Sequence, residues 1–141
     1  MTRANDEVWR RLVDLVMETR DDWRRALSEA TGLPFGRVRV LRRLADGPLT
    51  LGEIAEATGS DAPATTVTVN ALEAQGLVNR KPHPTNRRAK LVSLTADGRA
   101  TLAKAREVIE RAPAAFAAVA PADLAALRRL LDVLEASATE K

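Results

Sequence analysis

Residues 76–98 read GLVNRKPHPTNRRAKLVSLTADG, and this stretch decides the fold. Short apolar runs at 77–78 and 91–92 flank a basic segment that is interrupted by Pro82 and Pro84. The basic side chains between the two runs are Arg80, Lys81, Arg87, Arg88 and Lys90. This pattern predicts two strands joined by a basic loop. Such a loop suits a phosphate backbone or a minor groove, and the alternative is a solvated hairpin with a chance excess of arginine.

Composition limits the classes of protein that the chain can belong to. Its 141 residues suffice for one domain with a core. Ala, Leu, Arg and Glu abound while aromatic residues are only 3%, a balance that favours helices. Cysteine is absent and His83 is the only histidine, which argues against disulfides, metal sites and a histidine-based catalytic pair. We therefore expect no metal and no cofactor. With no long apolar run and no signal peptide, we expect a cytoplasmic protein that makes no contact with membranes.

Charge is distributed unevenly along the chain. The net charge of +3 permits a polyanionic partner without requiring one. Residues 44–79 contain no Lys or Arg, whereas basic residues lie on both sides of this segment. The acidic residues of the segment are Asp46, Glu53, Glu56, Asp61 and Glu73. If the chain binds DNA, its affinity for phosphate must come mainly from the flanking arginines and lysines.

Hydrophobic periodicity and capping signals predict six helices. A Thr50-x-x-Glu53 capping box opens the third, and Pro63 opens the fourth. Thr95 is placed to cap the fifth, after the second strand. The predicted helices cover about residues 6–30, 34–45, 50–59, 63–75, 95–111 and 121 onward.

Two short helices joined by a tight turn and followed by a hairpin describe a winged helix-turn-helix. The fold class is therefore mainly α (α+β). The first, fifth and sixth helices each carry an apolar stripe beyond what the small domain needs, which favours a homodimer over packing within one chain. We predict N-terminal and C-terminal dimerisation helices at 1–33 and 96–141, and a DNA-binding domain at 34–95.

The sequence resembles the MarR family of bacterial transcription regulators over nearly its whole length. Three runs carry the resemblance: LGEIA at 51–55, ALEAQGLV at 71–78 and RRAKLVSLTADG at 87–98. The resemblance implies a homodimeric, non-enzymatic repressor that binds a pseudo-palindromic operator in double-stranded DNA. It also implies release by a small aromatic or lipophilic effector.

The resemblance places the recognition helix at the fourth helix and the minor-groove probe at Arg87. In this chain the family's usual acidic wing residue is Thr85, and a common recognition-helix arginine is Val67. Because valine can pack on a thymine methyl but cannot bond guanine, we expect A/T-rich half-sites. Asn70 can pair with adenine or bond a phosphate. The expected DNA contacts are Thr65, Thr66, Val67, Asn70, Arg87, Arg88 and Lys90.

Several large side chains form a candidate ligand pocket, with Arg39 as an anion partner. The alternative for each of them is plain core or dimer packing. The predicted pocket residues are Trp9, Met17, Trp23, Phe35 and Arg39.

The sequence bears on two functional classes other than a DNA-binding regulator. A winged-helix module that binds proteins is supported by the absence of Lys and Arg from 44–79. An enzyme is disfavoured, because the sequence has no glycine-rich phosphate loop, no Cys, no Tyr and no nucleophile with a base at a suitable spacing.

Overall fold

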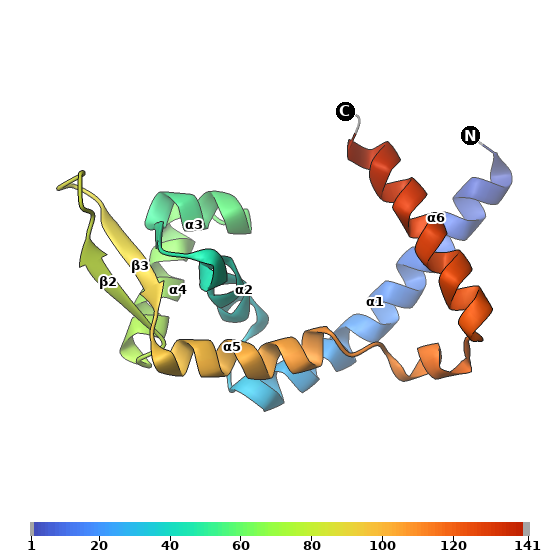
Figure 1. The fold of residues 1–141 in the computed structure, drawn as a ribbon, viewed down its shortest axis with the longest axis horizontal. Coiled ribbons are helices and arrows are strands. Elements are labelled where there is room, and N and C mark those ends of the chain that lie inside the picture. The colour runs from blue at the N-terminus through green and yellow to red at the C-terminus, as the bar shows by residue number, and fades with distance from the viewer. Residues whose placement is uncertain (1, 140–141) are drawn as a thin grey trace. The chain divides into compact units, whose positions relative to one another are not determined.

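The computed structural model describes residues 2–139, which divide into two compact units, one up to Glu110 and one from Arg111 (Figure 1). Six α-helices and three strands make up most of these residues. The helices are α1 (Arg3–Thr31), α2 (Phe35–Arg43), α3 (Leu51–Thr58), α4 (Ala62–Ala74), α5 (Ala96–Ile109) and α6 (Pro121–Thr139). The strands are β1 (Leu49–Thr50), β2 (Val78–Pro82) and β3 (Lys90–Leu94), and short 3-10 turns are η1 (Leu44–Asp46) and η2 (Ala114–Ala118).

The capping signals read from the sequence are confirmed. Thr50 Oγ1 accepts a hydrogen bond from the Glu53 amide at 3.2 Å, and Glu53 Oε1 accepts one from the Thr50 amide at 3.1 Å. Gly59 ends α3 in the left-handed conformation, with φ of 65°. The carboxylate of Asp61 caps α4 through the Ala64 amide at 2.7 Å, so this helix begins just before Pro63.

The capping box lowers the pKa of one carboxyl. Hydrogen bonds from the Thr50 backbone and then its side chain, aided by nearby His83, hold the pKa of the Glu53 carboxyl below its ordinary 4.5, although desolvation opposes them. A carboxyl whose pKa is lower in the folded chain than in the unfolded chain stabilises the fold when the pH is above the unfolded-chain pKa. This stabilisation is lost as the pH falls through the folded-chain pKa. Between about pH 5 and pH 3 the thermal midpoint should therefore fall less in Glu53→Gln than in the unmodified chain. Equal falls in calorimetry would contradict this linkage.

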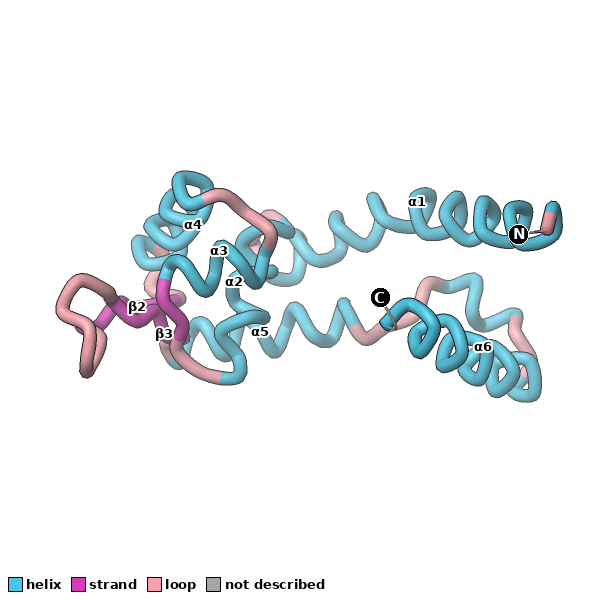
Figure 2. Tube along the Cα trace, turned by 90° about the horizontal axis from the view of Figure 1, so that it is seen from above, coloured by secondary structure: helices cyan, strands magenta, loops and turns pink. Residues whose placement is uncertain are grey.

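The predicted hairpin of β2 and β3 forms two strands of a three-stranded antiparallel sheet with the order β1-β3-β2. Its register pairs Val78 with Leu94 and Pro82 with Lys90, so the basic loop spans the residues between. Figure 2 shows this loop extending beyond the helices at one end of the first unit. The hairpin of β2, β3 and the loop between them is called the wing, and β3, the central strand of the sheet, joins it to the helical part of the domain through β1.

The core of the first unit joins all of its helices and its sheet. The fully buried side chains include Leu27 of α1, Ile54 of α3 and Val92 of β3. The remaining large ones are Leu33, Leu41, Leu72, Val38, Val69 and Val78. α5 contacts α1 and α2, and thereby fixes the sheet and the helix-turn-helix on one scaffold.

The start of α5 is tied to the root of the wing. Thr95 Oγ1 donates to the Gly76 carbonyl at 2.6 Å and accepts from the Gly98 amide at 3.0 Å. The Thr95 amide donates to the Leu77 carbonyl at 3.1 Å. A Cβ on Gly98 would lie 2.0 Å from the Leu77 carbonyl oxygen, so this approach requires glycine. The threonine and the glycine of the run L-T-x-x-G at 94–98 are thus explained by their contacts with the start of the hairpin.

Apolar side chains remain exposed in both units. On α1, Trp9 is 67% exposed and Val16 is 61% exposed. On α6, Val133 and Leu134 are 59% and 57% exposed, and none of the helix's residues is buried. Among residues 2–139, no helix is both long enough and apolar enough to cross a membrane.

Candidate nucleic-acid interface

The helix α4, which is expected from the sequence to read DNA bases, has one buried face and one exposed face. Val69 and Leu72 are fully buried, whereas Val67 is 68% exposed and Asn70 is exposed. Half-buried Thr66 donates its hydroxyl to the Ala62 carbonyl at 3.0 Å, and its oxygen can still accept hydrogen bonds. The exposed face thus presents an aliphatic group, a hydroxyl and an amide, the groups that read base edges.

Thr65 does not belong to that exposed face, contrary to the sequence-based expectation. Its side chain is 2% exposed, and its hydroxyl donates to the Asp61 carbonyl at 2.8 Å. It lies one turn before buried Val69, on the inner stripe of the helix. A side chain buried there cannot reach a base, so we remove Thr65 from the expected DNA contacts.

The tip of the wing is ordered by two side chains. His83 Nδ1 accepts hydrogen bonds from the amides of Thr85 at 3.2 Å and Asn86 at 3.1 Å. Asn86 Oδ1 accepts one from the Arg88 amide at 3.1 Å. These contacts shape the turn that carries exposed Arg87, so Asn86 orders the turn in a wing that has Thr85 in place of an acid.

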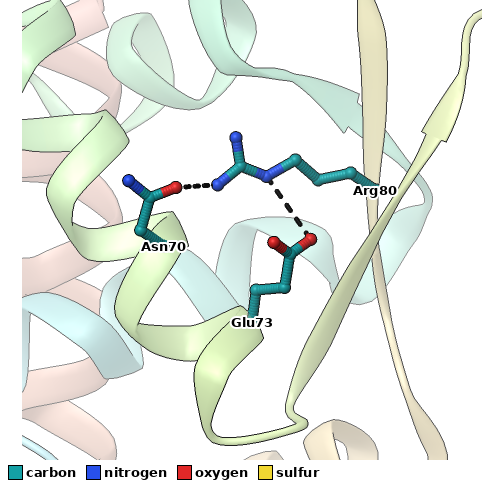
Figure 3. A network of polar contacts seen from close by, with 3 residues as sticks. All are labelled: Asn70, Glu73 and Arg80. Atoms are coloured by element: carbon teal, nitrogen blue, oxygen red, sulfur yellow. Dashed lines mark hydrogen bonds and ion pairs between the residues drawn. The ribbon is translucent and has the colours of Figure 1, made fainter.

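Arg80 links the wing to the recognition helix (Figure 3). Its Nη2 donates to Asn70 Oδ1, and its Nε lies 3.5 Å from Glu73 Oε2. Its side chain is only 18% exposed, whereas that of Glu73 is 45% exposed. Sequence reasoning counted Arg80 as one more charge of the basic loop and missed this contact. The link places the exposed amide of α4 beside the wing.

A shallow hollow of about 350 Å³ lies between the wing and the start of α3. Arg88 and Lys90 line it from the wing, and Thr50 and Gly52 line it from the helix start. These two cationic side chains form a surface suited to phosphate oxygens, whereas the start of α3 is already capped by Thr50 and Glu53. The positive charge that α4 lacks is therefore supplied by its neighbours.

The predicted pocket residues fall into two groups. The rings of Trp23 and Phe35 meet edge to face with centroids 5.1 Å apart, and the Arg39 guanidinium lies 5.9 Å from the Phe35 centroid. Arg39 Nη2 donates to the Thr58 carbonyl. Trp9 and Met17 are 67% and 52% exposed and do not line the hollow of about 170 Å³ beside Phe35.

Sequence reasoning missed a larger cavity of about 470 Å³ along α5. Apolar Leu44, Pro48 and Leu94 line it together with charged Arg99, Arg106, Glu107 and Glu110. None of the five predicted pocket residues lines it. Within residues 2–139, no cluster of three or more His, Asp or Glu side chains could hold a metal ion.

Comparison with known proteins shows what this domain resembles. Residues 31–89 match the model described as MarR family. Among curated proteins, none shows significant sequence similarity to the chain.

Solved structures match nearly the whole chain. The crystal structure of RV1404 from Mycobacterium tuberculosis is 25% identical, with a TM-score of 0.78 over 100% of this chain and 98% of that one. A probable transcriptional regulator from Pseudomonas aeruginosa is 28% identical, with a TM-score of 0.64 over 85% and 93% of the two chains. Sco3205, a MarR family transcriptional regulator from Streptomyces coelicolor solved in complex with DNA, is 21% identical, with a TM-score of 0.71 over 100% and 95%. The winged-helix fold predicted from the sequence is confirmed.

Proposed function

We propose that this chain, a transcriptional regulator with a MarR-family domain over residues 31–89, works as a homodimeric repressor of a pseudo-palindromic DNA operator. The observation that carries the proposal is the pairing of an exposed base-reading face on α4 with a basic wing beside it. In this arrangement α4 enters a major groove and Arg87 enters the adjacent minor groove. The fold shared with the DNA-bound Streptomyces protein supports this mode.

Salt dependence tests the proposed DNA contacts and separates them from a protein-binding role. We expect selection from a random duplex pool to recover an inverted repeat whose affinity falls steeply with salt. Arg88→Ala should weaken binding to all duplexes alike and lower the salt slope by about one unit per wing. Arg25→Ala removes an exposed charge from α1 and serves as the control. An Arg88→Ala variant with an altered preferred sequence would contradict the phosphate assignment.

The homodimer is proposed from the apolar stripes that one chain leaves exposed. Val8, Trp9 and Val16 of α1 are all more than half exposed, as are Leu130, Val133 and Leu134 of α6. Exposed apolar side chains in such number mark a protein interface. Light scattering should give about twice the chain mass of 15.3 kDa, and Trp9→Asp should shift the mass toward the monomer. A monomeric mass for the unmodified chain at micromolar concentration would refute the dimer.

Release by a small effector is the finer part of the proposal. Ligand sites usually occupy about 300–1,000 Å³. The cavity along α5, at about 470 Å³, falls in this range, and the hollow beside Phe35, at about 170 Å³, does not. An effector would release DNA only to the extent that it binds the two states with different affinity.

A further inference from the structure

The contact between Arg80 and Asn70 fixes the orientation of the Asn70 amide (Figure 3). A guanidinium carries only hydrogen-bond donors. The amide atom that faces Arg80 must therefore be the oxygen, because an amide nitrogen there would set donor against donor. The Nδ2 group of Asn70 is consequently turned away from Arg80, and the Asn70 side chain is exposed.

Arg80 is well placed to hold this orientation. It lies on β2 opposite Val92 of the central strand, and its side chain is only 18% exposed. Glu73, which follows Asn70 by three residues on the same helix face, lies 3.5 Å from Arg80 Nε through Oε2. Arg80 is therefore held between the strand and two residues of α4, so the amide orientation is set from outside the helix.

We propose that Arg80 is a specificity-determining residue: by holding the Asn70 oxygen toward itself, it leaves the Nδ2 group of Asn70 to donate in the major groove and thereby selects guanine over adenine. Pairing with adenine needs the amide oxygen to accept from N6 while the nitrogen donates to N7. Guanine instead presents two neighbouring acceptors, N7 and O6. With its oxygen engaged by a cation, Asn70 matches the guanine edge. The inference rests on the proposed entry of α4 into a major groove.

The base contacted by Asn70 can be identified without a complex structure. Duplex selection with the unmodified chain and with Asn70→Ala should differ at one position of each half-site. At that position we expect the unmodified chain to favour guanine over adenine by about tenfold. Inosine should replace guanine there without loss, because its major-groove edge is the same. A preference for adenine at that position, or no change at any position, would overturn the inference.

A charge-matched pair of variants tests the role of Arg80 itself. In Arg80→Met the amide of Asn70 can rotate, and the guanine preference should fall to within about threefold. Lys81→Met removes an exposed cation from the next position of β2 and should weaken binding while keeping the full preference. An Arg80→Met variant that keeps the tenfold preference would overturn the proposal.

A second variant covers the case in which Arg80→Met does not fold. Asn70→Asp keeps an acceptor for Arg80 but has no donor, so it should retain the thermal midpoint and lose the guanine preference. Retention of the preference would overturn the inference. If the unmodified chain recovers no duplex at all, the proposed function itself fails. If it recovers a defined duplex with adenine at the Asn70 position, only the role of Arg80 fails.

Discussion

Gly98→Ala is expected to destabilise the domain by about 3 kcal/mol, which lowers the thermal midpoint by about 10 °C. The added Cβ would lie 2.0 Å from the Leu77 carbonyl oxygen and 3.0 Å from the Leu77 carbonyl carbon. The clash is with backbone, so no side-chain rotation relieves it. Either α5 or the root of the wing must move. Thermal unfolding at fixed protein concentration, followed by circular dichroism, measures the effect.

Gly52→Ala is the matched control for this substitution. Gly52 also lies in the first turn of a helix, but a Cβ there would meet only Thr50 Oγ1, at 3.9 Å. Alanine should therefore leave the stability unchanged or raise it by about 0.5–1 kcal/mol. Equal midpoints for the two variants would show that the contact of Gly98 with Leu77 is looser than the structure indicates.

Arg87→Ala is expected to cause the largest loss of DNA affinity among single wing substitutions, about 1–3 kcal/mol. Arg87 is exposed in the turn ordered by His83 and Asn86, and a cation inserted into a narrow minor groove gains from its enhanced negative potential. The loss should be greater on duplexes with an A/T-rich segment under the wing than on G/C-rich ones. Fluorescence anisotropy with both duplexes measures the difference.

Arg87→Lys separates shape readout from charge. Lysine keeps the charge but cannot reproduce the planar guanidinium, so its affinity should fall between those of the unmodified chain and Arg87→Ala. A loss in Arg87→Ala of the same size on both duplexes would assign Arg87 to the phosphate backbone.

Local signals explain why so much of the fold could be read from the sequence. Thr50, Glu53 and Thr95 act within one helical turn, so their spacing alone predicts the caps. The hairpin could also be predicted from the sequence, because its apolar runs are bounded by turn residues. The strand β1 was missed since two residues, Leu49 and Thr50, carry no periodic pattern.

The misplacement of Thr65 was avoidable. Thr65 lies four residues before Val69 and seven before Leu72, on the same helical stripe as these inward-facing residues. The contact between Arg80 and Asn70 could not be predicted from spacing along the sequence. It depends on how β2 crosses α4, and no spacing along the chain reports that crossing.

The predicted pocket shows another limit of reasoning from residue type. Trp9 and Trp23 lie fourteen residues apart on one helix, which corresponds to about 20 Å. Only Trp23 reaches Phe35 within the chain. Composition identified the large apolar residues correctly, but the geometry of a straight helix keeps them from sharing one wall.

The contacts of Thr95 and Gly98 connect the hairpin rigidly to α5, the helix that follows it. The Leu77 carbonyl accepts a hydrogen bond from the Thr95 amide, and the backbone of Gly98 packs closely against it. The hairpin and α5 are therefore tightly packed at this point. If α5 tilts together with the hairpin, the tip that carries Arg87 and Arg88 moves with it. In a paired assembly, the distance between the two tips would follow the angle between the two α5 helices.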